Sequence, residues 1–300
     1  MPFLRIPSIR LGLDLWLSAI LAIPLAAESL LLYQKSTITF TQVDYPAAFS
    51  TGVNGISSSG EIVGTYNLSL GGNSHGFVLL NGQFTSFDYP GAVLTEVSGV
   101  NDASMIVGTA VLNITSEKAV GFTYDGHTFT TISFPGHPYT EANGINNNGD
   151  IVGRTGNLYT HLAAYKFSDG QYTYITPPGQ YPSEGAFGIN DLGDVVGYVY
   201  SSKFASAFLL KNNVFTFFNP GGGYAYGINN SEAIAGTYYT SSLLPAGFVS
   251  RDGKRVSVVF PGSNGTSTVT ISNSNPVGGT YYTDVPYANH GYVTSPIILP

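Results

Sequence analysis

The sequence contains no cysteine, a single tryptophan, two methionines and only 10% charged residues. The absence of cysteine excludes disulfide bridges, thiolate nucleophiles and cysteine-bound metal sites. A chain of 300 residues without such cross-links must be stabilised by packing and by its topology.

Basic residues are also scarce. Eleven Lys and Arg stand against eighteen Asp and Glu, and two of the arginines, Arg5 and Arg10, lie near the N-terminus. Proteins that bind nucleic acid obtain much of their affinity from clustered cations that neutralise phosphates. With a formal net charge of −7 at pH 7, this chain is not expected to bind nucleic acid.

Apolar and turn-forming residues are abundant instead. Hydrophobic residues make up 43% of the chain, which also contains 37 Gly, 21 Tyr and 18 Phe. Aromatic and β-branched residues punctuated by glycine are typical of strands joined by tight turns. The composition predicts a globular all-β protein.

The first 34 residues differ from the rest of the chain. A basic start is followed by an apolar stretch near 15–23, then by Pro24 and small residues, which is the order of a secretory signal. An uncleaved membrane anchor is the alternative, although Asp14 and Glu28 interrupt the apolar run. We expect residues 1–34 to be a signal peptide or N-terminal anchor and the protein to be extracellular or periplasmic, with membrane contact only through an uncleaved N-terminal segment.

One phrase recurs six times at nearly even spacing along the chain. Self-similarity with a period of about 40 to 45 residues is typical of architectures that repeat one supersecondary unit. The copies are GISSSGEIVG from Gly55, GVNDASMIVG from Gly99, GINNNGDIVG from Gly144, GINDLGDVVG from Gly188, GINNSEAIAG from Gly227 and TISNSNPVGG from Thr270.

Each repeat is predicted to hold four short strands. The phrase itself reads as a hairpin, in which Gly-Ile-Asn ends the first strand and Ile-Val-Gly begins the second. The third and fourth strands are joined by dipeptides that tolerate the positive φ required at both central positions of a type I′ turn. These dipeptides are Asn81-Gly82, Asp125-Gly126, Asp169-Gly170, Asn212-Asn213 and Asp252-Gly253.

The last repeat lacks a fourth strand, because the sequence ends soon after its third. The segment 39–45 stands alone before the first repeat and matches the fourth-strand pattern, with FTQVDYP resembling FTSFDYPG. A ring that pairs both termini in one sheet removes exposed strand edges. The sequence therefore predicts a six-bladed β-propeller over 35–300, with four antiparallel strands per blade, closed by an N-terminal strand that completes the last blade.

The repeats resemble the HAF repeats of bacterial extracellular proteins, which are named for a His-Ala-Phe triplet. The resemblance rests on Gly-Ile-Asn, then Gly-Asp-Ile-Val-Gly, then a small residue and an aromatic, and it covers roughly 40–293. No copy spells the full triplet, although HGF from His75 and HGY from His290 keep the histidine. The resemblance implies repeated β-structure and an extracellular location. It implies no established activity and therefore assigns no catalytic residue.

Recognition is expected on the face that carries the longer connections, because variable loops on a rigid scaffold commonly bind ligands. Tyrosine is frequent there, and its flat ring with a hydroxyl suits both sugar rings and protein partners. The alternative is that these rings pack between blades. The candidate binding residues are Tyr66, Tyr198, Tyr238, Tyr239, Tyr281, Tyr282 and Asp284.

Three glutamates, Glu96, Glu141 and Glu184, fall just before the innermost strand of successive repeats and are the candidate catalytic residues. Carboxylates that meet near the axis raise one another's pKa and can serve acid–base chemistry. Solvated turn residues are the alternative interpretation. No third ligand accompanies His75 and His290, so the sequence predicts no metal site, and it indicates no cofactor.

These features favour a secreted, non-catalytic binding protein that recognises a glycan or a protein through its loop-rich face. A carbohydrate-active enzyme, a glycosidase or lyase with carboxylates at the axial mouth, is one alternative. A structural surface or matrix protein is another.

Glycosidases hold two carboxyls about 5 Å apart when retaining and about 6.5 to 9.5 Å apart when inverting. The surroundings of the glutamates therefore bear directly on the choice between binding and catalysis.

Overall fold

The computed structural model describes residues 38–116, 118–157, 161–179, 183–200, 205–218, 223–283 and 288–299. These residues form twenty-four β-strands and no helix, which confirms the all-β class. In this part of the chain, nothing helical is long and apolar enough to cross a membrane. The signal or anchor expected over 1–34 and the candidate residue Asp284 lie outside the described residues.

The strands form six groups of four, numbered here 1 to 6 in chain order, and group 6 takes its fourth strand from the N-terminal end. Groups 1 to 3 are β2 (Ser50–Ile56), β3 (Ile62–Asn67), β4 (Ser74–Leu80) and β5 (Gln83–Phe87); β6 (Leu94–Val100), β7 (Ile106–Asn113), β8 (Lys118–Tyr124) and β9 (Phe129–Ile132); and β10 (Tyr139–Ile145), β11 (Ile151–Asn157), β12 (His161–Ser168) and β13 (Gln171–Ile175). Groups 4 to 6 are β14 (Ser183–Ile189), β15 (Val195–Tyr200), β16 (Ala205–Lys211) and β17 (Val214–Phe218); β18 (Tyr224–Ile228), β19 (Ile234–Tyr239), β20 (Pro245–Arg251) and β21 (Lys254–Val258); and β22 (Gly265–Ile271), β23 (Val277–Tyr282), β24 (Asn289–Thr294) and β1 (Phe40–Val43).

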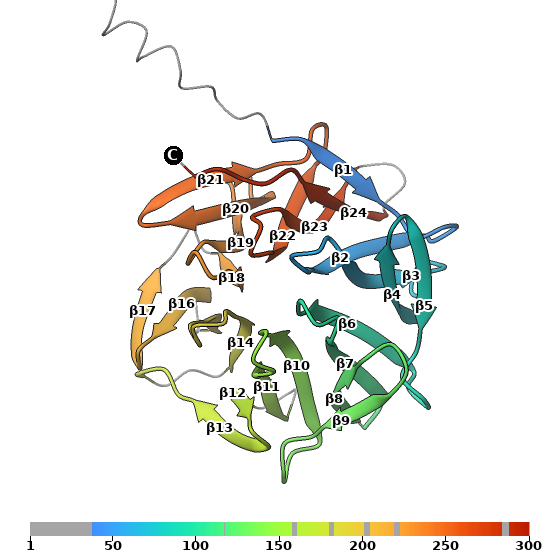
Figure 1. Ribbon diagram of the computed structural model, residues 1–300, viewed down its shortest axis with the longest axis vertical. Helices are drawn as coiled ribbons and strands as arrows, with labels where there is room; N and C mark the ends of the chain where they lie inside the picture. Colours follow the sequence, from blue (N-terminus) through green and yellow to red (C-terminus); the bar gives the residue numbers. More distant parts are fainter. Residues whose placement is uncertain are drawn as a thin grey trace, which may run out of the picture. The chain divides into compact units, whose positions relative to one another are not determined.

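Within each group neighbouring strands pair antiparallel, in sequence order in groups 1 to 5 and with β1 placed after β24 in group 6. The first strands, from β2 to β22, lie toward the middle of the unit, and the fourth strands lie at its periphery (Figure 1). Each first strand contacts the first strands of the neighbouring groups, and β22 also contacts β2. Single parallel pairs, Ala119 with Tyr139 and Leu162 with Ser183, join groups 2, 3 and 4.

The N-terminal strand β1 lies where a strand was expected over 39–45. It pairs antiparallel with β24, from Phe40 opposite Thr294 to Val43 opposite Gly291. The two ends of the described chain thus share one sheet, and the outer edge of β24 is covered. An uncovered edge would present a row of unpaired backbone donors and acceptors.

The apolar core lies between neighbouring groups. Val63 and Phe87 of group 1, for example, pack with Val97 and Phe122 of group 2. Each third strand buries one aromatic ring in this way, which explains the small-residue and aromatic pattern of the repeats. These rings are Phe77, Phe122, Tyr165, Phe208, Phe248 and Tyr292.

Four of the five expected hairpin turns have the predicted backbone. At Asn81-Gly82, for example, φ is 51° and 76°, and the turns at 169–170, 212–213 and 252–253 are alike. The fifth prediction, Asp125-Gly126, is wrong, because only Gly126 has a positive φ. There the loop runs from 125 to 128, and the Asp125 carboxylate accepts hydrogen bonds from the two backbone N–H groups that follow Gly126.

The asparagine of the repeated phrase has two structural roles. In group 3, Oδ1 of Asn146 accepts hydrogen bonds from the backbone N–H groups of Asn148 and Asp150, which closes the turn between β10 and β11. Its Nδ2 donates over 3.0 Å to the carbonyl oxygen of Asn190 in group 4. Equivalent residues repeat both roles in groups 2, 4 and 5, at Asn101, Asn190 and Asn229. The phrase recurs because each turn closes itself and also binds the next group.

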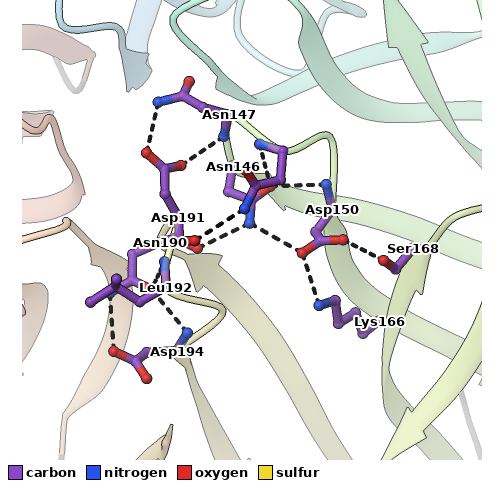
Figure 2. A network of polar contacts seen from close by, with 10 residues as sticks. Asn146, Asn147, Asp150, Lys166, Ser168, Asn190, Asp191, Leu192 and Asp194 are labelled. Atoms are coloured by element: carbon purple, nitrogen blue, oxygen red, sulfur yellow. Dashed lines mark hydrogen bonds and ion pairs between the residues drawn. The ribbon is translucent and has the colours of Figure 1, made fainter.

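A second line of hydrogen bonds joins the same turns. Figure 2 shows one of these links, in which the backbone nitrogen of Asn147 donates to the Asp191 carboxylate over 2.8 Å. The donors, in order, are Ser58, Asp102, Asn147, Asp191 and Asn230, and the acceptors are Asp102, Asn147, Asp191, Asn230 and Asn273. The turns of all six groups are thereby connected.

Glycine residues allow the strands in the middle of the unit to lie very close together. A Cβ atom on Gly144 would lie 2.6 Å from the carbonyl oxygen of Phe187 in group 4. A Cβ atom on Gly153 would overlap the carbonyl oxygen of Glu141. A side chain at either position would therefore push neighbouring strands apart.

We expect Asn146→Ala to lower the free energy of unfolding by about 2 to 3 kcal/mol, because it leaves buried backbone atoms without their hydrogen-bond partners. Asn148→Ala is the matched control: this exposed side chain donates one hydrogen bond, to the carbonyl oxygen of Asp191, and its loss should cost less than about 1 kcal/mol. Denaturant titration measures both values. Equal losses would contradict the double role of Asn146.

Candidate functional site

A central cavity opens where the first strands begin, on the side of the longer connections. It encloses about 390 Å³, and residues of all six groups line it. Cavities that hold small molecules commonly enclose about 300 to 1,000 Å³. The size of the central cavity therefore suits a ligand of one or two rings.

Each first strand carries a β-bulge at the same place. In group 3 the register shifts by one residue between Ala142 and Gly144, and the other five groups shift at the equivalent positions. The extra residue of a bulge leaves the regular ladder, so its side chain is re-aimed. The six extra residues are Asn54, Ser98, Asn143, Phe187, Tyr226 and Val269, and all of them line the central cavity.

Groups 4 and 5 supply an aromatic wall, defined here as Phe187 and Tyr226. Their ring centroids lie 5.6 Å apart in an edge-to-face contact. Phe187 also stacks on Tyr198 at 4.9 Å, and Tyr198 meets Tyr224 edge-to-face at 4.8 Å. Rings held by such contacts present a fixed apolar surface, on which the apolar face of a ligand ring can pack.

Groups 1 to 3 supply polar atoms to the lining of the same cavity. Nδ2 of Asn54 donates over 2.6 Å to the carbonyl oxygen of Val97, and Nδ2 of Asn143 donates over 3.2 Å to that of Ala186. Each amide is therefore held by the neighbouring group. Fixed amides beside an aromatic surface give a binding site both its orientation and its specificity.

A largely buried ion pair stands beside the cavity. Arg154 on β11 donates through Nε and Nη2 to the two carboxylate oxygens of Glu141 on β10, over 2.5 and 2.9 Å. Tyr139 donates its hydroxyl to the same carboxylate. Burial lowers the pKa of Arg154, but the charge of Glu141 and the hydrogen bonds to it, together with Tyr198 and Tyr139, outweigh burial and raise the pKa. Burial and the charge of Glu141 both raise the pKa of Tyr139, so its hydroxyl stays protonated.

Glu96 on β6 has a different environment. Its side chain is exposed to the central cavity, and the described residues offer it no hydrogen bond or ion pair. Enclosure by the cavity walls raises the pKa of Glu96, the nearby Glu141 raises it further, and Arg154 lowers it. Glu96 is therefore a free carboxyl, whereas Glu141 is neutralised and held.

Glu184 does not occupy the strand position of the other two glutamates. Glu96 pairs with Thr109 and Glu141 with Arg154, whereas Glu184 pairs with Val199. Its register is one residue earlier, equivalent to that of Thr95 and Thr140, and successive positions along a strand alternate between its two faces. All three glutamates also lie inside first strands, not before them as expected. The three therefore do not form an equivalent set.

Two of the candidate tyrosines belong to the packing between groups. Tyr66 and Tyr281 are only 6% and 5% exposed. Tyr66 stacks on Tyr45 and Tyr281 on Phe260, each with ring centroids 3.7 Å apart. Tyr66 and Tyr281 are therefore packing residues, as the alternative interpretation of the tyrosines predicted, because their ring faces are already covered.

The remaining candidates are distributed differently. Tyr198 supports the aromatic wall through Phe187. Tyr238 lies under the guanidinium of Arg255, which is 4.5 Å from its ring centroid. Tyr239 is 43% exposed. Tyr238, Tyr239 and the half-buried Tyr282 are not among the residues that line the central cavity.

Sequence reasoning missed the bulge residues, of which Phe187, Tyr226, Asn54 and Asn143 contribute most of the chemistry. A signal for them exists in the repeats. The residue just before each phrase varies between polar, aromatic and aliphatic types, whereas in five of the six repeats it is preceded by Val or Ala and followed by Gly. A position that varies within a fixed framework is free of the framework role and available for binding.

No protein-family model matches the chain, and no curated protein matches it in sequence. Solved structures match it in fold. A protein provisionally assigned as a gluconolactonase is 10% identical, with a TM-score of 0.54, over 87% of this chain and 92% of that chain. A variant of Aleuria aurantia lectin bound to Fucα1-6GlcNAc is 9% identical, with a TM-score of 0.52, over 86% and 97%. The SapL1 lectin bound to α-methyl fucoside is 14% identical, with a TM-score of 0.51, over 85% and 98%. At such identities these likenesses show the fold alone, which is propeller-like.

We expect Glu141→Gln to lower the free energy of unfolding by about 2 to 3 kcal/mol, because it leaves a largely buried guanidinium without its counter-charge. Glu232→Gln is the control, since it removes an exposed ion pair with Lys211 and should leave stability nearly unchanged. Denaturant titration at neutral pH compares the two. Unchanged stability in Glu141→Gln would show that the ion pair is not structural.

Proposed function

We propose that this chain is a non-catalytic carbohydrate-binding protein that takes one or two sugar rings into the central cavity. The observation that carries the proposal is the pairing of the aromatic wall with the fixed amides of Asn54 and Asn143. A sugar ring has apolar C–H faces that pack on aromatic rings and hydroxyls that bond to amides. The hollow between the six first strands suits a small ligand better than the flat surface of a protein.

The glutamates support binding over hydrolysis. Glycoside hydrolysis uses two carboxyls that flank the scissile bond, one as acid and the other as base or nucleophile. Glu141 is held at both oxygens by Arg154, and Glu96 is the free carboxyl of the cavity. A glycosidase of this kind would need a second free carboxyl in the same cavity.

The structural likenesses are compatible with this function. Two of the similar proteins are lectins that hold fucosides. A propeller-like scaffold of this size thus supports sugar recognition in other proteins. The choice of the central cavity rests on this chain's own residues.

We further propose that the six groups are the blades of a closed six-bladed propeller, that its repeats belong to the HAF family and that the chain is exported. Pairing of β1 with β24 and contact of β22 with β2 support closure. The repeated phrase and the order of residues 1–34 support the family and the export.

A second candidate function is protein binding on the loop-rich face. Large apolar side chains are exposed on three of the loops that join second and third strands, where Leu70 is 80% and Leu243 is 79% exposed. Exposed apolar side chains that gather on one face commonly mark an interaction site. This surface is separate from the cavity lining, so variants distinguish the two functions.

Oligosaccharide binding, measured by calorimetry, tests the carbohydrate proposal. We expect Phe187→Ala and Tyr226→Ala to weaken binding at least about 10-fold, because each removes a ring on which the ligand packs. Phe187→Leu keeps the apolar volume without the flat face and should be intermediate. Tyr239→Ala, which removes an exposed ring outside the lining, should bind as the native chain does.

Two results of that experiment count against the proposal. A loss of binding in Tyr239→Ala but not in Phe187→Ala would place the ligand on the loops. Release of new reducing ends by the native chain, abolished in Glu96→Gln, would make the protein an enzyme. Melting temperatures of all variants identify any that fail to fold.

Closure is tested by removal of β1. A chain that begins at Tyr45 lacks β1 and leaves the edge of β24 open. We expect it to melt at a lower temperature and to aggregate, because an open edge can pair with another chain. A chain that begins at Ile38 keeps β1 and is the control, which should show neither effect. Thermal melting with light scattering measures both effects. Identical behaviour of the two chains would show that β1 does not close the fold.

A further inference from the structure

Glu96 is the only charged side chain among the described residues that line the central cavity. Two other carboxylates close to the first strands have partners. Glu141 is bound by Arg154, and the buried Glu61 accepts a hydrogen bond from Ser104 over 2.7 Å. The side chain of Glu96 is exposed to the cavity, so its carboxylate can bind a ligand without first breaking a contact within the described residues. Such groups are characteristic of functional sites.

The charges around Glu96 leave one negative charge uncompensated. Glu96 and Glu141 each carry one negative charge, and Arg154 carries one positive charge that Glu141 already binds through two hydrogen bonds. The other polar residues of the lining, such as Asn54 and Asn143, are neutral. The cavity therefore favours a cation over an anion.

The aromatic wall adds a second attraction for a cation. Tyr226 lines the same cavity as Glu96, and the faces of aromatic rings attract ammonium ions. The ring of Phe187 also lines the cavity, but Tyr198 stacks on it and the Arg154 guanidinium lies 5.8 Å from its centroid, so Phe187 contributes apolar surface and no second cation site. A carboxylate and an ammonium also form a hydrogen bond stronger than one between neutral partners. The two interactions together suit a ligand with an apolar ring and a protonated amine.

Building on the proposed function, we propose that the central cavity selects carbohydrates that carry a free protonated amino group, which donates to the carboxylate of Glu96. The amide groups of Asn54 and Asn143 then form hydrogen bonds with the hydroxyls of the sugar, and the aromatic wall packs against the apolar face of the sugar ring. An N-acetylated sugar of the same length lacks the positive charge and is bound less well. The shape of the cavity favours such a sugar ring over the flexible side chain of a lysine in a peptide.

The protonation state of Glu96 sets how the affinity for an amino sugar depends on pH. Its pKa is raised by enclosure and by Glu141 and is lowered by Arg154, and Tyr139 is the other titratable residue that interacts with it. Tyr139 stays neutral and Arg154 stays charged, because the pKa of each is raised. As the pH falls through the pKa of Glu96, the carboxylate becomes neutral while the amine stays charged. Affinity for an amino sugar should therefore fall on acidification, more steeply than affinity for its acetylated counterpart.

The test compares glucosamine oligomers with N-acetylglucosamine oligomers of equal length, by calorimetry on the full chain. We expect the native chain to bind the glucosamine oligomers at least about 10-fold more tightly, the size expected for a charged hydrogen bond. Glu96→Gln keeps the size of the side chain but removes its charge, and it should abolish this preference. Glu232→Gln removes an equal charge from an exposed ion pair outside the cavity lining and should keep it.

The outcomes separate this inference from the proposed function. Equal binding of both oligomers by the native chain overturns the selection of amines and leaves carbohydrate binding in place. A preference that survives in Glu96→Gln overturns the role of Glu96. Equally tight binding of a lysine-containing peptide overturns the selection of a sugar ring. No binding of any oligosaccharide by a folded native chain overturns the proposed function itself.

Discussion

The asparagine amides that join one hairpin turn to the next hold the first strands at the spacing on which the cavity depends. Asn146 closes its own turn and binds the carbonyl oxygen of Asn190, and the same pair of roles passes from group to group. That spacing leaves no room for a side chain at Gly144. The phrase that repeats along the chain is therefore a single device that combines a turn, a link between groups and a close approach of strands.

The β-bulge separates the site from this framework. Within each first strand, the residues on both sides of the bulge pair in the ladder with the second strand. The extra residue, such as Asn143 or Phe187, has no partner in the ladder and lines the central cavity. The ligand chemistry of the cavity can thus differ between groups while the scaffold stays constant. This arrangement brings amides and aromatic rings together in the lining of one cavity.

Two glutamates at the same strand position show how surroundings decide the role of a residue. Glu141 has Arg154 opposite it and is neutralised, whereas Glu96 has Thr109 opposite it and stays free. Burial and the nearby charge of Glu141 raise the pKa of Glu96, while Arg154 lowers it. Their sequence contexts are alike, so this difference is not visible in the residues next to them.

The sequence by itself determined the all-β class, the six repeated units, most of the hairpin turns and the position of the N-terminal strand. These features depend on local patterns: alternating apolar residues, dipeptides such as Asn81-Gly82 that accept positive φ, and a period that repeats along the chain. The tertiary structure decided which tyrosines are covered, that Glu184 is out of register with Glu96, and that the bulge residues meet in one cavity. A one-residue shift in a strand reverses the face of a side chain, and contacts between groups decide which faces remain open.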